Sequence, residues 1–157
     1  AGYAAATFYT LVYTLMSAGA FAVIILLSAN GIEAENLDDF KGLNARSPWF
    51  ALMMLMLMFS LAGIPVFVGF FAKWQVIAAA IDAGFTGLAI LAVVTAVIGA
   101  FYYLRIVKLM YFDEPENTAP VHAPFDFKAV LSINGIAMLA LGLFSGGLIS
   151  LCVSAFA

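Results

Sequence analysis

Cysteine and histidine, which carry much of protein redox and metal chemistry, are almost missing from this sequence. It holds one cysteine, Cys152, and one histidine, His122. A single cysteine can form no disulfide within the chain, and it cannot supply the cysteine set of a zinc or iron–sulfur site. We therefore expect this chain to hold no metal and no cofactor of its own.

Charge is also scarce, and this second absence sets the class of protein. Asp, Glu, Lys and Arg make up 10% of the residues, whereas soluble domains carry about 25%. Hydrophobic residues make up 66%, and the mean hydropathy is +1.11. A single core could not hide so much apolar surface from water. We predict an integral membrane protein in contact with the lipid bilayer, and the lack of a basic patch argues against nucleic acid as a partner.

Long apolar segments make up most of the chain. A bilayer core is about 30 Å thick, so a helix needs about 20 apolar residues to cross it. Helices are favoured because they satisfy their backbone polar groups internally, and the alternation of a membrane barrel strand is absent. We predict one all-α membrane domain over residues 1–157, a fragment of a longer subunit because it opens without Met at an apolar segment. Its five transmembrane helices are expected over residues 4–29, 48–63, 66–83, 86–112 and 127–157.

Two polar loops, residues 31–46 and 113–127, separate these segments and hold most of the charge. Lys41 and Arg46 lie in the first loop, while Arg105, Lys108 and Lys128 flank the second. If each segment crosses the membrane once, the two loops lie on opposite sides. The positive-inside rule then places the second loop in the cytoplasm and the C-terminus outside.

The sequence Gly63-Ile64-Pro65 interrupts the chain between the second and third segments. Proline removes a backbone donor and clashes with the preceding turn, so it breaks or ends a helix. Two interpretations stay open. The break lies within a helix at membrane depth, as in transporters, or it is a plain tight turn between two spanning helices, which the segment lengths fit at least as well.

Lys73 lies inside the third predicted helix, beyond Pro65. At 1.5 Å per residue the lysine is about 12 Å deep, near the bilayer midplane. A charged lysine there costs about 2.5–3.5 kcal/mol, so we expect it to face the interior of the helix bundle. Burial disfavours the charged form of an amine and allows proton exchange nearer neutral pH. Our favoured hypothesis is a proton relay, and the alternative is a permanent ion pair with a carboxylate.

Other candidates carry less weight. Tyr9 and Tyr13 belong to a polar stripe on the first predicted helix, which suits either a water path or hydrogen bonds between helices. Tyr103, close to the end of the fourth segment, is typical of an interfacial aromatic belt. Gly142-x-x-x-Gly146 is a helix-packing motif.

The stretch "GLNARSPWFALMMLMLMFSLAGIPVFVGFFAKW" resembles the antiporter-like membrane subunits of respiratory complex I, which share ancestry with Mrp-type cation/proton antiporters. The elements Ser-Leu-Ala-Gly-Ile-Pro, Gly-Phe-Phe-x-Lys and Tyr-Tyr-Leu-Arg carry this resemblance, together with "FYTLVYTLMSAGAFAV" and "DDFKGL". The resemblance covers nearly the whole chain. One departure concerns the break, because many relatives have Pro-Pro where this chain has Pro65-Val66.

The resemblance implies a fourteen-helix subunit with two inverted five-helix repeats, each with a discontinuous helix, of which this chain would be the last five helices. Lys73 matches the lysine of the second discontinuous helix, which belongs to the proton-transfer chain near the exit half-channel. Gly63, Pro65 and Gly69 match the segment that leads into it. The lysines and the glutamate of the first repeat lie outside this sequence.

The resemblance also implies a function. The chain would be part of a translocase that couples electron transfer from NADH to quinone with proton pumping across the bacterial inner membrane. Its partners would be other membrane-arm subunits, and FMN and the iron–sulfur clusters would lie on subunits elsewhere in the complex. Two rival functions stay open: a subunit of a Mrp-type antiporter that uses the same lysine, and a structural scaffold in which the lysine is a static ion pair.

Overall fold

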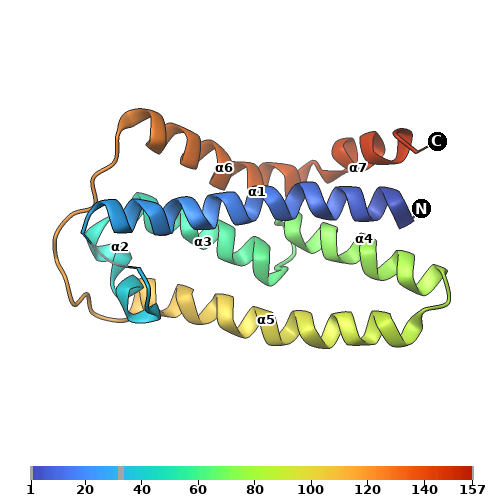
Figure 1. Cartoon of the computed structure of the whole chain (residues 1–157), viewed down its shortest axis with the longest axis horizontal. Helices are drawn as coiled ribbons and strands as arrows, with labels where there is room; N and C mark the ends of the chain where they lie inside the picture. The colour runs from blue at the N-terminus through green and yellow to red at the C-terminus, as the bar shows by residue number, and fades with distance from the viewer. Residues whose placement is uncertain (1, 32–33, 157) are drawn as a thin grey trace.

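The computed structural model describes residues 2–31 and 34–156, and its regular elements in those ranges are helical (Figure 1). This agrees with the predicted all-α membrane class. In chain order the elements are α1 (Gly2–Ala29), the 3-10 helix η1 (Leu37–Phe40), α2 (Leu43–Arg46), α3 (Pro48–Ala62), α4 (Val68–Asp82), α5 (Thr86–Phe112), α6 (Phe125–Leu143) and α7 (Ser145–Ser154).

Helices of two lengths make up the bundle. In the described part of the chain, three helices are each long and apolar enough to cross a membrane, namely α1, α5 and α6. By contrast, α3 and α4 have 15 residues each, or about 22 Å of helix, which is less than a bilayer core of about 30 Å. The structure therefore gives three single-helix spans where the sequence predicted five.

The two short helices α3 and α4 run end to end in the same direction (Figure 1). Together they extend alongside α5, and their junction lies midway along the molecule. A tight turn between two spanning helices would instead reverse the chain direction. The structure therefore does not contain that turn, and the chain continues along the bundle axis after the interruption.

The last predicted helix, over 127–157, is two helices in the structure, and its final residue, Ala157, lies outside the described residues. Helix α6 ends at Leu143, and α7 begins at Ser145. Phe144 between them has φ −118° and ψ 34°, which is not a helical conformation. Gly146 and Gly147 follow immediately, and glycine has a low helix propensity. The expectation of one uninterrupted helix there is wrong.

The two polar loops lie at the same end of the bundle, which corrects the prediction that they lie on opposite sides. Lys41 Nζ is 3.0 Å from Glu116 Oε1. Asn30 Nδ2 donates to the His122 carbonyl oxygen at 2.8 Å, and the Gly42 amide donates to the Leu109 carbonyl oxygen at 3.0 Å. The physical reason is the path of α3 and α4, which together make one traverse of the bundle rather than two.

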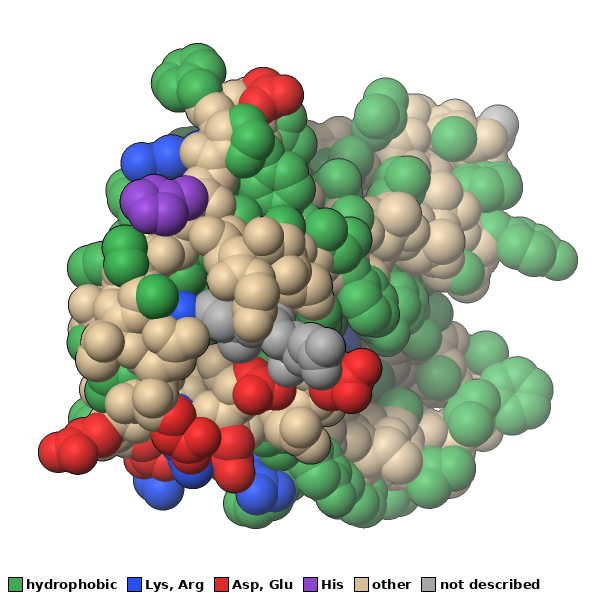
Figure 2. Space-filling model, turned by 60° about the vertical axis from the view of Figure 1, so that its left-hand side comes forward, with side chains coloured by type: hydrophobic (Ala, Val, Ile, Leu, Met, Phe, Trp, Pro, Cys, Tyr) green, Lys and Arg blue, Asp and Glu red, His purple; other side chains and the backbone are tan. Residues whose placement is uncertain are grey.

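Figure 2 shows acidic and basic side chains gathered at this end, which we call the charged end. It comprises the described residues of the two loops, 31, 34–46 and 113–124. Arg46 is buried there and donates from Nε to the Ala119 carbonyl oxygen at 3.1 Å. Burial lowers the pKa of the Arg46 guanidinium from its ordinary value. Both described chain ends lie at the opposite end of the bundle (Figure 1).

Helix α3 lies at the centre of the hydrophobic core and packs against α1, α5 and α6. Its methionine-rich run packs inward, since Met53, Met54 and Leu57 are all buried. Ser60 is a buried polar residue near the end of this helix. The core therefore surrounds the point at which α3 stops, and the residues at that junction are held by neighbours on several sides.

Candidate functional site

Helix α3 ends in a backbone arrangement that leaves one carbonyl free. Gly63 has φ +82°, a conformation that glycine adopts without a steric penalty. Its amide donates to the carbonyl oxygens of Phe59 and Ser60, and the Ile64 amide donates to that of Phe59, in the manner of a Schellman cap. No backbone amide of the described residues outside α3 reaches the Leu61 carbonyl oxygen. This oxygen is available to a side-chain donor.

The linker between α3 and α4 is held in an uncommon conformation. Val66 has φ +93°, and it is the one non-glycine residue at positive φ in the part of the chain that the structure describes. For a β-branched residue this is a genuine outlier, of a kind that costs about 1–3 kcal/mol. A proline ring fixes φ near −65°. The Pro65-Val66 pair therefore gives this linker a shape that a Pro-Pro pair cannot adopt.

The start of α4 is bonded to the end of α3. The Gly69 amide donates to Ser60 Oγ at 3.0 Å, and Ser60 Oγ donates in turn to Met16 Sδ on α1 at 3.0 Å. Gly69 is required by the close approach, because a Cβ there would overlap the Ser60 carbonyl oxygen. Ser60 thus satisfies one of the free amides at the N-terminus of α4 and joins three helices at one point.

Helix α6 supports the linker from another side. A Cβ added to Gly142 would overlap the carbonyl oxygen of Val66 and the backbone of Phe67. Gly146, the second glycine of the predicted packing motif, has no atom within 4 Å of an added Cβ. Of these two glycines, therefore, only Gly142 makes a close contact within this chain, and it does so with the linker between α3 and α4.

Lys73 reaches back from α4 to the free end of α3. Its Nζ donates to the Leu61 carbonyl oxygen at 2.7 Å, and its side chain passes over Gly63, where an added Cβ would lie 3.3 Å from Nζ. Among the described residues, no carboxylate lies within ion-pair distance of Lys73. The cation therefore faces the partially negative C-terminal end of a helix rather than an acid.

A cavity of about 370 Å³ lies beside Lys73, between α1, α4 and α5. Tyr9 and Tyr13 line it from α1, with their ring centroids 5.9 Å apart and their planes nearly parallel. The structure therefore brings the predicted residues Tyr9, Tyr13, Gly69 and Lys73 to one cavity. Gly63 lines a neighbouring cavity that Lys73 also borders, whereas Pro65 is exposed on the linker.

Sequence reasoning missed three residues of this region. Ser60 begins the Ser-Leu-Ala-Gly-Ile-Pro element, but the sequence pattern predicted no role for it at the site. Tyr103 was interpreted as part of an interfacial belt, yet it lines the cavity from α5, together with Thr95. The available signal was spacing, because Thr95, Gly99 and Tyr103 follow each other at intervals of four residues and so share one helix face.

Residues 1–99 match the family described as NADH:quinone oxidoreductase/Mrp antiporter, transmembrane. A protein of Alkalilimnicola ehrlichii named NADH-quinone oxidoreductase subunit N is 58% identical over 156 residues, which is 99% of this chain and 32% of that protein. The subunit N of Thioalkalivibrio sulfidiphilus is 57% identical over 98% of this chain and 32% of its own length. This chain thus spans about a third of these relatives.

Two solved structures share the fold. A chain of respiratory complex I from Thermus thermophilus with bound aureothin has a TM-score of 0.81 and 32% sequence identity, over 94% of this chain and 34% of that one. A chain of the Mrp complex from a Dietzia species has a TM-score of 0.82 and 25% identity, over 96% of this chain and 36% of that one. The same helix arrangement therefore occurs in a chain of respiratory complex I and in a chain of an Mrp complex.

Proposed function

Because this chain belongs to the NADH:quinone oxidoreductase/Mrp antiporter transmembrane family, we propose that it is the C-terminal part of a subunit N that translocates protons in the membrane arm of an NADH–quinone oxidoreductase. Two relatives that bear this name match 98–99% of the chain at 57–58% identity. The partners are the other membrane-arm subunits, and the location is the bacterial inner membrane. NADH, quinone, FMN and iron–sulfur clusters belong to the whole complex and its other subunits.

We further propose that α3 and α4 cross the membrane together as one discontinuous helix. Their common direction supports this, and so do their lengths of 15 residues each. The chain then makes four passes instead of five, with α6 and α7 forming the last. Five of its six Lys and Arg residues lie at or next to the charged end, and Lys73 is the sixth. By the positive-inside rule the charged end faces the cytoplasm and the chain ends face outward.

One observation carries the assignment of Lys73 as the proton carrier: its Nζ bonds to the Leu61 carbonyl oxygen at the border of a cavity. A protonated amine has three donors, and this bond uses one of them. The others are free to bond water in the cavity. Because no carboxylate of the described residues pairs with it, Lys73 can lose its proton without stranding a buried acid. It takes a proton from the water path and passes it toward the outside.

The test is Lys73→Met in the assembled complex, reconstituted in vesicles, with proton uptake and NADH–quinone turnover measured together. We expect normal assembly with pumping and coupled turnover lowered at least tenfold. Lys108→Met is the matched control, since it removes a lysine whose side chain is 68% exposed and which does not line the cavity beside Lys73, and it should leave both rates unchanged. Wild-type rates in the Lys73 variant would rule out the relay, and failed assembly alone would favour the structural scaffold.

The second candidate is a subunit of a cation/proton antiporter without a redox arm, which the match to the Mrp complex supports. Lys73 would serve the same purpose there. Affinity purification of the full-length subunit from its membrane separates the two functions. Recovery of flavin and iron–sulfur subunits supports the redox complex, and their absence from an intact assembly supports the antiporter.

A further inference from the structure

Three cavities follow one another from the charged end to Lys73. The first, of about 420 Å³, lies among the polar loops and is lined by Glu35, by Asn36 and by several further side chains, most of them charged. The second, of about 370 Å³, is also lined by Glu35 and Asn36, and it extends between α1 and α5. The cavity beside Lys73 is the third. Shared lining residues join each cavity to the next.

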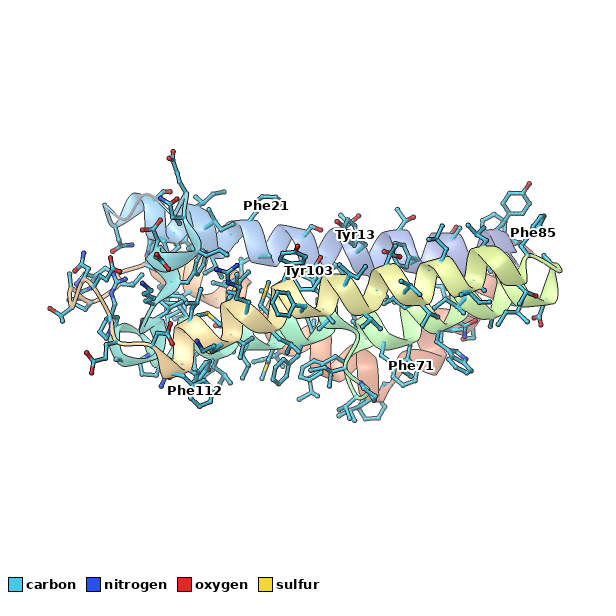
Figure 3. The ribbon with its side chains drawn as sticks, turned by 90° about the horizontal axis from the view of Figure 1, so that it is seen from below. Tyr13, Phe21, Phe71, Phe85, Tyr103 and Phe112 are labelled. Atoms are coloured by element: carbon cyan, nitrogen blue, oxygen red, sulfur yellow. The ribbon has the colours of Figure 1, made fainter. Side chains whose placement is uncertain are left out.

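The second and third cavities meet at Tyr13, Leu61 and Tyr103, which line both. Figure 3 shows Tyr13 and Tyr103 on the facing sides of α1 and α5. Leu61 is the residue whose carbonyl oxygen accepts the bond from Lys73. The two cavities therefore form one crevice, which we call the α1–α5 crevice, and Lys73 is among the residues that line it.

Polar side chains occur at intervals along this crevice. Tyr13 and Ser17 are four residues apart on α1, so their side chains share one face about 5–6 Å from each other. Tyr103 stands opposite on α5, and Glu35 stands at the mouth. Each cavity has room for several waters, because one water occupies about 30 Å³. Water is retained in a cavity when two to four polar partners are in reach, and these side chains supply them.

We propose that the α1–α5 crevice is a hydrated access path that carries protons between the charged end and Lys73. Glu35 exchanges protons with water at the mouth, and Ser17, Tyr13 and Tyr103 hold the waters that lead inward. A proton that enters at Glu35 ends on the neutral Lys73 amine as an ammonium, and no bond other than those to hydrogen changes. The proposal rests on the function proposed above and adds a direct supply to Lys73 from the charged end.

The test is cysteine accessibility in the full complex. Ser17→Cys is compared with Ala18→Cys, which lies at the same depth of α1 but off the crevice. The cationic, membrane-impermeant thiosulfonate MTSET is applied to the charged end in vesicles of one orientation and to the other end in vesicles of the opposite orientation. Mass spectrometry of this subunit gives the labelling rate. The wild-type chain, whose one cysteine is buried, gives the background.

We expect Ser17→Cys to react from the charged end at least tenfold faster than Ala18→Cys and at least tenfold faster than from the other end. Its modification should also lower proton pumping several-fold. Equal rates for the two positions, or faster reaction from the opposite end, would overturn the path. If Ser17→Cys does not assemble, Ala20→Cys replaces it, because Ala20 lines the same cavity.

The labelling experiment and the Lys73→Met experiment can fail independently of each other. Normal pumping in the Lys73→Met complex would refute Lys73 as a carrier whatever the labelling shows. Unlabelled Ser17→Cys and Ala20→Cys, with pumping lost in Lys73→Met, would refute the path and leave the carrier in place.

Discussion

Two lysines of this chain lie in opposite surroundings, and the contrast shows how the protein handles charge. Lys41 at the charged end is 3.2 Å from Asp38 and 3.0 Å from Glu116. Lys73 at the helix junction bonds to a backbone carbonyl, and no described carboxylate pairs with it. Where water is present, acids and bases pair on the surface. In the apolar interior, the C-terminal end of α3 provides the partially negative partner.

The same contrast applies to what holds each region together. The charged end relies on exposed ion pairs, which contribute little to stability. The helix junction relies on close backbone approaches and on a buried hydroxyl, which tolerate little change in volume or bonding. Substitutions that add volume or remove a hydrogen bond at the junction should therefore be far more costly than substitutions at the charged end, and the following four predictions test that difference.

Gly142→Ala should have the largest effect on stability. The new methyl group would overlap the Val66 carbonyl oxygen, and overpacking of this kind costs about 1–3 kcal/mol. Gly146→Ala is the control, because it meets open space and replaces glycine within a helix, which is neutral or slightly stabilising. Thermal unfolding of the full-length subunit in detergent measures both. Equal unfolding temperatures would contradict the close contact between α6 and the linker.

Ser60→Ala should cost about 1–3 kcal/mol, because the buried Gly69 amide loses its acceptor. Ser150→Ala is the matched control, since its hydroxyl bonds within its own helix to the Gly147 carbonyl oxygen and is exposed. The same unfolding experiment applies. If Ser60→Ala lost no more stability than Ser150→Ala, water or another group would have to replace the Ser60 hydroxyl as the acceptor at the start of α4.

Val66→Gly should raise stability slightly. Relief of the positive φ gains about 1–3 kcal/mol, and the greater freedom of glycine in the unfolded chain returns about 0.5–1 kcal/mol of it. Val66 is 49% exposed, so little packing is lost. A modest increase in the unfolding temperature is expected. A decrease would show that the side chain of Val66 stabilises the linker more than its backbone strain destabilises it.

Lys41→Met should have the smallest effect, with an unfolding temperature within the scatter of the wild type. Hydrogen bonds to Glu116 and then to Asp38 raise the pKa of Lys41 above 10.5. A raised pKa in the folded state means that the contribution is complete at neutral pH and is lost only as the pH rises through the raised value. Exposed ion pairs contribute little to stability, so screening them with high salt should change the unfolding temperature of the wild type little at pH 7. If Lys41→Met lowered the unfolding temperature as much as Ser60→Ala does, the charged end and the helix junction would not differ in their contribution to stability.

Much of the candidate site could be recognised from local sequence. Lys73 stands out because it is a cation in the middle of an apolar run, and Gly63-Ile64-Pro65 stands out because proline and glycine interrupt helices whatever surrounds them. Ser60 and Tyr103 could not be assigned in this way. A serine near a helix end and a tyrosine near a loop are common, and their neighbours come from other helices.

The direction of the chain after the break was also beyond local reasoning. A tight turn and a chain that continues in the same direction can begin with the same residues. The segment lengths and the Gly63-Ile64-Pro65 interruption are therefore compatible with both. The continuation follows from contacts between residues far apart in the chain, such as Ser60 with Met16 and Val66 with Gly142. That choice in turn put both polar loops at one end of the bundle, where the sequence had predicted opposite sides.

Composition and local pattern by themselves determined that this protein is helical, that it belongs in a membrane, that the chain is interrupted at Gly63-Ile64-Pro65 and which cation is out of place. These properties depend on the free energy of apolar surface in water and on the backbone geometry of proline and glycine, which act residue by residue. Only the tertiary structure decided that the lysine meets a helix end, that α1 and α5 enclose a crevice beside it, and that both charged loops share one end. Those features depend on which helices pack together, because each is made by residues that meet only in the folded bundle.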